Sequence, residues 1–252
     1  MDKIITAKDL CKTYITDSIS NNVLCNVNFE MDEGEFVSIM GPSGSGKSTL
    51  LYTISGMDSP TSGKVIFCGK DLSATDRKEL NDIRLNKMGF IFQQMYMLKK
   101  LCIIDNIVLP AYEAGGSRKE INARAESLMR RLGIIETAEH RITEVSGGEL
   151  QRACLCRALI NSPKVIFADE PTGALNSKAA KEVMHELTKA NEDGTAILMV
   201  THSARVAACS ERVIYLMDGG ICGELKLGKT VDNSDHGERE RKVRAWLTNQ
   251  GW

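Results

Sequence analysis

The residues best suited to chemistry are nine consecutive positions, Gly41-Pro42-Ser43-Gly44-Ser45-Gly46-Lys47-Ser48-Thr49. Glycines at three of these positions allow a positive φ and let backbone N–H groups approach phosphate oxygens closely. Lys47 supplies a positive charge that reaches the β- and γ-phosphates, and the Ser48 hydroxyl can bind Mg²⁺. The spacing therefore predicts a loop that binds the phosphates of a nucleotide.

The flanks of this loop support the interpretation. Residues 35–40 form an apolar run typical of a buried strand, and residues 47–55 are typical of the start of a helix. A helix N-terminus adds partial positive charge where the phosphates would lie. The alternative, a glycine-rich turn with an accidental lysine, is disfavoured by this context.

Two acidic residues follow a second apolar run. Residues 164–168 predict a strand, Asp169 ends it and Glu170 follows. Asp169 is suited to holding Mg²⁺ or its waters, and Glu170 to orienting and deprotonating a water that attacks the γ-phosphorus. The alternative is a surface acidic pair at the end of a strand.

A second anion site is predicted where Ser146-Gly147-Gly148 leads into a helix. One nucleotide rarely needs two such sites in the same chain. A head-to-tail dimer would use both, because Ser146-Gly147-Gly148 of each chain would close on the γ-phosphate held by the other.

The elements that must position these residues are those of an α/β protein. Apolar runs, and the alternation of Val23, Cys25, Val27 and Phe29 with polar or small residues, predict strands. Apolar residues at helical spacing predict helices, and residues 16–22 predict a loop. Ser117 and Glu120 fit a capping box, residues 231–241 are polar and expected to be loose, and Val243, Trp246 and Leu247 have helical spacing that could dock on the body. The strands are expected at 4–14, 23–31, 35–40, 64–67, 88–92, 164–169, 195–200, 212–217 and 221–227, and the helices at 47–55, 76–86, within 103–135 and at 177–191.

Composition limits the classes of function. The chain has 252 residues and a formal net charge of −1, so no global field attracts nucleic acid, and no nucleic-acid partner is expected. No run approaches the roughly 18 apolar residues of a membrane helix, and the first residues lack the apolar core of a signal peptide. A membrane role would therefore come through a partner. The eight cysteines include no C-x-x-C pair and are interpreted as reduced thiols of the core, with a metal site as the weaker alternative.

Over about residues 1–230, the motifs resemble, in order, those of the ATP-binding subunits of ABC transporters. Two departures stand out, because Val145 and Glu149 flank the Ser-Gly-Gly where leucine and glutamine are usual, and Asn176 replaces a commoner aspartate. The resemblance implies that Tyr14 stacks on the base, residues 41–49 are Walker A, Gln93 contacts Mg²⁺ and water, residues 145–149 are the signature, residues 165–170 are Walker B with the catalytic glutamate, and His202 senses the γ-phosphate.

The resemblance also implies the fold and the partners. The fold would be an ABC-type P-loop NTPase, α/β, with a RecA-like core, an antiparallel β subdomain and an inserted helical subdomain at about 93–161. Residues 1–230 would form this domain, and 231–252 a polar extension with a short helix. ATP and Mg²⁺ would be the cofactors. A second copy of the chain and an integral-membrane permease would be the partners, at the cytoplasmic face of the membrane. The catalytic set would be Glu170, His202, Lys47 and Gln93, and the metal set Ser48, Gln93 and Asp169.

Residues 173–177 and the Ser-Gly-Gly-Glu run resemble one branch of the family, which contains the macrolide-exporter, lipoprotein-release and cell-division (FtsE-like) ATPases. Gly-Ala-Leu-Asn-Ser is most like the bacitracin-resistance type, which acts against antimicrobial peptides. The alternatives are a non-transport ABC ATPase, which would carry coiled-coil, zinc or second-cassette segments, and an inactive scaffold. Apolar residues after Gln93 are expected either to contact the permease or to pack in the helical subdomain's own core: Tyr96, Met97, Leu98 and Leu101.

Overall fold

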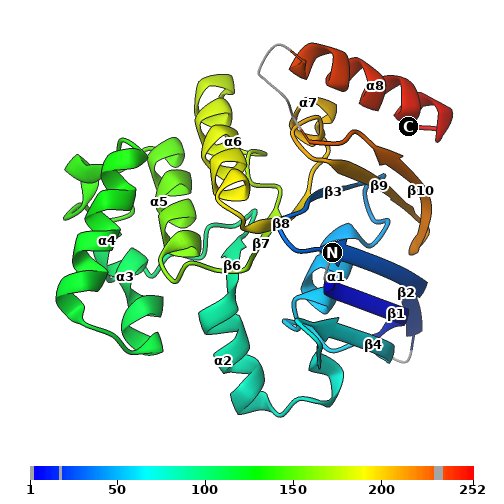
Figure 1. Cartoon of the computed structure of the whole chain (residues 1–252), viewed down its shortest axis with the longest axis horizontal. Coiled ribbons are helices and arrows are strands. Elements are labelled where there is room, and N and C mark those ends of the chain that lie inside the picture. Colours follow the sequence, from blue (N-terminus) through cyan, green and yellow to red (C-terminus); the bar gives the residue numbers. More distant parts are fainter. Residues whose placement is uncertain (1–2, 17–18, 230–234) are drawn as a thin grey trace. The chain divides into compact units, whose positions relative to one another are not determined.

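The computed structural model describes residues 3–16, 19–229 and 235–252. Figure 1 shows the helices and strands coloured along the chain. The chain divides into two compact units. The first comprises Met1–Leu80 and Ala196–Trp252, and the second comprises Asn81–Thr195.

An antiparallel sheet of the first unit has the strand order β2-β1-β4-β5. A break in the strand alternation of β2 accompanies a positive φ of 52° at Asn26, where the register with β1 shifts. This bulge buries Leu24 and exposes Cys25, the reverse of the simple alternation expected. The strands are β1 (Lys3–Thr16), β2 (Ile19–Asp32), β4 (Ser62–Phe67) and β5 (Lys70–Asp71).

The loop expected at 16–22 is much shorter than predicted. β1 continues through Thr16, and β2 already begins at Ile19, so that Thr16 pairs with Ile19 and Ile15 with Ser20. Residues 17–18 lie outside the described residues. Polar residues such as Asn21 and Asn22 lie in the strand because both faces are exposed there.

A second set of strands in the first unit has the order β10-β9-β3-β8. β3 (Phe36–Met40) runs parallel to both β8 (Ala196–Val200) and β9 (Arg212–Met217), and β10 (Gly220–Lys226) is antiparallel to β9. Every residue of β3 and β8 is buried, which explains why both read as continuous apolar runs. Helix α1 (Lys47–Ile54) follows β3, and α7 (Ala204–Ala207) follows β8.

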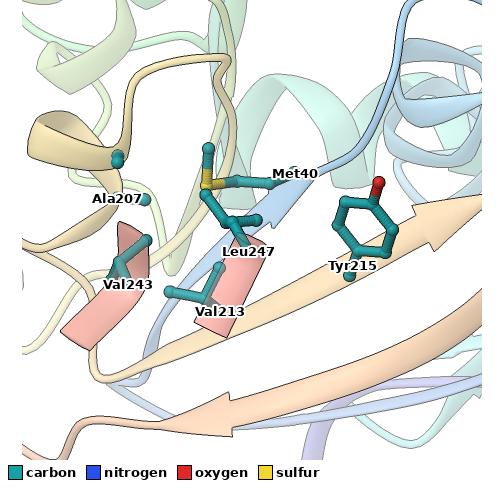
Figure 2. Packing of buried hydrophobic residues seen from close by; sticks show 7 residues of the cluster. Met40, Ala207, Val213, Tyr215, Val243 and Leu247 are labelled. Atoms are coloured by element: carbon teal, nitrogen blue, oxygen red, sulfur yellow. The ribbon is translucent and has the colours of Figure 1, made fainter. Parts of the chain in front are cut away.

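Helix α8 (His236–Asn249) packs on this part of the first unit. Val243 and Leu247 are buried, and Trp246 packs beside them. Figure 2 shows Val243 and Leu247 against Met40, Ala207, Val213 and Tyr215. The segment expected to be loose up to residue 241 is therefore helical from His236, while residues 231–234 lie outside the described residues.

Arg239 explains why a polar segment is helical and docked. Its side chain is buried, and within the described residues its guanidinium donates to backbone carbonyl oxygens and lies near the Asp235 carboxylate. The carbonyl acceptors, with their distances, are Ala208 (2.8 Å), Ser210 (2.7 Å), Gly228 (3.0 Å) and Leu227 (3.1 Å).

The second unit combines a parallel strand pair with helices. β6 (Met88–Ile91) pairs with β7 (Val165–Asp169). Only part of the expectation for the cysteines holds. Cys154 and Cys156, on α5 (Gly147–Leu159), are buried, and burial raises the pKa of Cys154 to about 11, whereas Cys25 and Cys222 are exposed and are not core residues. No helix of the described part of the chain is long and apolar enough to span a bilayer. The helices are α2 (Arg77–Lys87), which begins before residue 81, α3 (Ile103–Ala114), α4 (Arg118–Arg131), α5 (Gly147–Leu159) and α6 (Ser177–Glu192), with short 3₁₀ turns at Leu72–Ala74 and Ile135–Thr137.

We predict that replacing Arg239 with methionine lowers the free energy of unfolding by about 3 kcal/mol, because several buried carbonyl oxygens lose charged donors at once. Urea unfolding followed by tryptophan fluorescence measures this change. Arg241→Met is the matched control, since Arg241 lies on the same helix but is exposed, and its effect is expected to stay within about 0.5 kcal/mol. Equal effects of the two substitutions would contradict the role given to Arg239.

Candidate active site

The predicted phosphate-binding loop lies between β3 and α1 of the first unit. Gly41, Gly44 and Gly46 all have positive φ, at 154°, 79° and 97°. A Cβ atom at Gly41 would lie 2.0 Å from the carbonyl oxygen of Leu216, and one at Gly46 would lie 2.8 Å from that of Val23. Glycine is therefore required at both positions by close backbone approach as well as by φ.

Lys47 is the first residue of α1 and is buried. Its Nζ donates to the carbonyl oxygen of Pro42 at 2.7 Å, so the ammonium lies against the backbone of the loop. Ser48 and Thr49 follow in the first turn of the helix, next to its positive end. Cation, helix terminus and backbone N–H groups therefore belong to one short segment, as the sequence predicted.

Tyr14, the predicted base-stacking residue, is held by contacts with Asp58 and Lys12. Its hydroxyl donates to Asp58 Oδ2 at 2.6 Å, and Lys12 Nζ lies 4.8 Å from its ring centroid. Lys12 also donates to Asp58 Oδ1 at 2.6 Å. Tyr14 as a residue remains 41% exposed, so a flat group can stack on its ring.

The electrostatics of this cluster follow from burial and hydrogen bonding. Burial, together with the hydrogen bond to Asp58, raises the pKa of Tyr14, against the opposing effect of the Thr49 hydroxyl. Burial alone would raise the pKa of Asp58, but the hydrogen bonds from Lys12 and Tyr14 outweigh it and lower that pKa. Asp58 is therefore ionised and fixes the phenol beside the first turn of α1. Sequence reasoning missed Asp58 because it lies 44 residues from Tyr14.

His202 is exposed and follows β8 in the same unit. Ile39 of β3 pairs with Val200 of β8, so Gly41 and His202 each stand two residues beyond a registered pair. The Thr201 N–H donates to the Ile39 carbonyl oxygen at 3.2 Å and extends this register. Parallel strands thus bring His202 to the sheet edge that carries the phosphate-binding loop.

The acidic pair lies in the second unit, where it follows a registered pair of parallel strands just as His202 does in the first unit. Ile91 of β6 pairs with Ala168 of β7, so Gln93 and Glu170 each stand two residues beyond that pair. Asp169 is buried at the end of β7. Glu170 has a φ of 50°, a left-handed conformation that non-glycine residues rarely adopt and that concentrates at functional sites.

Ser146 begins α5 and forms a capping box with Glu149. The Ser146 N–H and Oγ donate to Glu149 Oε2 at 2.8 and 2.7 Å, and the Glu149 N–H donates back to Ser146 Oγ at 3.3 Å. The two hydrogen bonds that Ser146 donates to the carboxylate lower the pKa of Glu149. Ser146 and Gly147 are exposed. The capping box expected at Ser117 is not formed, because its side chain makes no capping hydrogen bond.

Two polar contacts near this helix were not predicted. Arg152 of α5 donates to Glu182 of α6 at 2.7 Å and joins the two helices. Asn176 is the N-cap of α6, since its side chain accepts from the N–H groups of Lys178 and Ala179. Asparagine therefore has a local structural role at the position where aspartate is commoner.

The loop after Gln93 is held by its backbone. Arg157 of α5 donates to the carbonyl oxygens of Met95 (2.9 Å) and Tyr96 (2.8 Å). Asn106 of α3 accepts from the Leu98 N–H at 2.7 Å. Tyr96 has a φ of 43°. The side chains divide into two groups: Tyr96 and Leu98 are exposed, Met97 is buried, and Leu101 is half-buried.

The predicted site residues thus fall into two sets. Tyr14, residues 41–49 and His202 belong to the first unit, and Gln93, Ser146-Gly147-Gly148, Asp169 and Glu170 belong to the second. Apart from Tyr14, which lies within β1, the polar residues of each unit end or follow a strand or begin a helix. The arrangement supplies groups that bind phosphate and a carboxylate that can accept a proton.

Comparisons with known proteins identify the family of the chain. The model of the ABC transporter family matches residues 24–173. The chain is 43% identical over 203 residues to the lipoprotein-releasing system ATP-binding protein LolD of Aquifex aeolicus, covering 81% of this chain and 91% of that protein. It is 40% identical over 218 residues to the uncharacterized ABC transporter ATP-binding protein YknY of Bacillus subtilis, covering 86% and 95%.

A further relative is the macrolide export ATP-binding/permease protein MacB of Marinobacter nauticus, 38% identical, with 96% of this chain covered but only 38% of that longer protein. Two dimeric structures of the cassette MJ0796, one bound to ADP and Pi, each superpose with a TM-score of 0.85. They are 41% and 42% identical, and each match covers 90% of this chain and 100% of the other. The predicted fold class is therefore confirmed.

We predict that Lys47→Ala weakens binding of ATP at least tenfold and nearly abolishes hydrolysis, because a charge-assisted hydrogen bond to phosphate is worth about 1.5–3 kcal/mol. Binding is measured with a fluorescent ATP analogue and hydrolysis by phosphate release. Lys64→Ala is the control, because Lys64 is an exposed lysine on β4 of the same unit. Normal turnover by Lys47→Ala would show that the loop does not bind the phosphates.

Proposed function

The chain belongs to the ABC transporter family, and from that premise we propose that it is the ATP-hydrolysing subunit that powers a membrane permease by closing and reopening as a homodimer around two ATP molecules. One observation carries the proposal. A phosphate-binding loop, a strand-end carboxylate pair and an exposed, capped helix N-terminus at Ser146 all occur in one chain. The site would lie at the cytoplasmic face of the membrane, where the permease holds the subunit.

Binding of ATP is assigned to the first unit. The Tyr14 ring would stack on the adenine, with its phenol held by Asp58. The N–H groups of residues 41–49 and the Lys47 ammonium would hold the β- and γ-phosphates. The Lys47 hydrogen bond to Pro42 supports this role, since it shows the ammonium already directed along the loop.

Mg²⁺ fits the donors that the chain offers. A hydroxyl, a carboxylate and an amide oxygen are hard ligands, and Mg²⁺ in nucleotide sites takes one or two protein ligands together with phosphate oxygens. Ser48, Asp169 and Gln93 would hold it. When bound, the ion would neutralise charge on the phosphate oxygens.

The hydrolytic step is assigned to Glu170 and His202. Glu170 would accept a proton from water while the water oxygen forms a bond to the γ-phosphorus, and the bond from that phosphorus to the β,γ-bridging oxygen breaks to release ADP. His202 would donate a hydrogen bond to a γ-phosphate oxygen and stabilise the negative charge there. The left-handed backbone at Glu170 supports its role, because strain of this kind concentrates at functional sites.

The dimer would place Ser146-Gly147-Gly148 of one chain against the γ-phosphate bound by the other. Ser146 and Gly147 are exposed at the start of α5, and the capping box with Glu149 fixes the backbone conformation of that terminus. The two MJ0796 structures are dimeric, which supports a dimer for this chain as well. Glu149, the departure from the usual signature, keeps the terminus intact through its hydrogen bonds to Ser146.

We predict that Glu170→Gln lowers kcat by about 10²–10⁴-fold, the usual contribution of a general base, and accumulates as a dimer with two trapped nucleotides. Light scattering after size exclusion with ATP and Mg²⁺ measures the mass. Glu192→Gln, at an exposed position on α6, should hydrolyse ATP normally and return to monomer. A monomeric Glu170→Gln protein with normal hydrolysis would refute both the dimer and the base.

Coupling to the permease is assigned to the exposed part of the loop after Gln93. Tyr96 and Leu98 present 64% and 51% of their surfaces, while Arg157 and Asn106 hold the backbone beneath them. Arg157 belongs to α5, the helix that begins at the proposed γ-phosphate contact. A shift of α5 would therefore move this loop directly. Met97 is buried, so it belongs to the packing of the second unit rather than to the contact surface.

The proposal extends to the class of compound that the permease transports. The run Gly173-Ala174-Leu175-Asn176-Ser177 favours a permease that removes antimicrobial peptides of the bacitracin type. Lipoprotein release and macrolide export are the second candidates, favoured by the names of the relatives LolD and MacB.

We predict that deleting the gene from its host raises sensitivity to bacitracin and nisin-like peptides, and that the wild-type gene restores growth. Leu98→Asp should fail to restore growth while keeping normal folding and basal ATPase activity. Met97→Asp should instead lower the unfolding temperature, because it buries a charge. Unchanged sensitivity to the peptides, with a defect in lipoprotein sorting, macrolide resistance or division, would move the assignment to a sister system.

A further inference from the structure

Helix α8 ends beside His202. The ring centroids of Trp252 and His202 lie 5.9 Å apart, with the planes tilted by 32°. Trp252 also packs edge-on against Tyr215 of β9, at 6.3 Å between centroids. The proposed γ-phosphate sensor thus contacts an aromatic ring that comes from outside all of the sequence motifs.

The end of α8 directs the indole there. Gly251 has a φ of 85°, its N–H donates to the Thr248 carbonyl oxygen, and the Trp252 N–H donates to that of Leu247 at 3.1 Å. These two hydrogen bonds form a Schellman motif, which reverses the chain after the helix. The reversal brings residue 252 back toward Tyr215 instead of continuing along the helix axis.

The helix itself is fixed. Val243 and Leu247 are buried, and Arg239 binds four backbone carbonyl oxygens. Trp246 also packs edge-on against Tyr215, the residue that Trp252 contacts, with 6.2 Å between the ring centroids. A Cβ at Gly223 of β10 would lie 3.0 Å from Gln250 Oε1, so strand and helix end are in close contact. The indole is therefore presented from a rigid support.

We propose that Trp252 is a positioning residue for His202, because it restricts the rotation of the imidazole and holds it ready to face the γ-phosphate. His202 is exposed and lies on a short connection between β8 and α7, and the indole excludes the rotamers that would place the imidazole in the space that the indole occupies. The proposal rests on the proposed function, in which His202 contacts that phosphate. The neighbouring ring would raise the fraction of molecules in the productive rotamer without touching ATP.

The first test separates kcat from KM in the full chain. Trp252→Ala is expected to lower kcat about three- to tenfold, the size of one aromatic pair, with an unchanged KM for ATP, and Trp252→Phe should restore most of the rate. His202→Gln is measured in parallel. Loss of activity in His202→Gln with normal kcat in Trp252→Ala would overturn the proposal alone. Normal activity in His202→Gln would overturn the role of His202, and the proposal with it.

The second test detects the contact between Trp252 and His202 without measuring ATP hydrolysis. The chain contains two tryptophans, so Trp246→Phe leaves Trp252 as the only indole, and phenylalanine keeps an aromatic ring against Tyr215. Its fluorescence should fall as pH drops through the histidine range, because an imidazolium in contact quenches indole emission. Adding His202→Gln should remove this transition, whereas adding His236→Gln should leave it. A transition that survives His202→Gln, or a rise in kcat in Trp252→Ala, would overturn the proposal.

Discussion

The registered pairing of buried parallel strands is the constraint on which the candidate residues of each unit depend. In each unit, two candidate residues stand two positions beyond a registered pair, Gly41 and His202 in the first and Gln93 and Glu170 in the second. The backbone ladder therefore fixes where each polar side chain leaves the sheet. Because β3, β7 and β8 are buried along their whole length, a slip in register would exchange the side chains packed on the two faces of each strand and disrupt the close packing of both, which makes these positions robust.

Much of this could be predicted from the sequence, because buried parallel strands read as apolar runs and the phosphate-binding loop has a fixed spacing. The errors came from contacts distant in the chain. The alternation of β2 failed at the bulge of Asn26, and Asp58 went unnoticed because it meets Tyr14 only after folding. The segment after residue 235 looked loose because its arginines are polar. One of them, Arg239, turned out to be buried against carbonyl groups that no side-chain pattern reveals.

Helix α5 carries three contacts that the sequence analysis did not connect with one another. Its N-terminus carries the capping box of Ser146 and Glu149, its middle pairs with α6 through Arg152, and Arg157 holds the loop that exposes Leu98. A helix is stiff along its axis, so displacement at one end is transmitted to the other. Glu149, which stands where glutamine is usual in the family that the chain resembles, is compatible with this arrangement, because its carboxylate accepts from the N–H and the hydroxyl of Ser146.

The anchoring of α8 has a consequence for sequence drift. All four carbonyl oxygens that receive the Arg239 guanidinium belong to the main chain. Main-chain carbonyls are present whatever side chain occupies the position, so the polar part of the anchor is indifferent to the residue types at those four acceptor sites. The polar part of the anchor therefore depends on the identity of one residue, Arg239. A duplicated copy of this gene could therefore lose the polar part of the anchor through one substitution, while the packing of Val243 and Leu247 would still hold α8 in place.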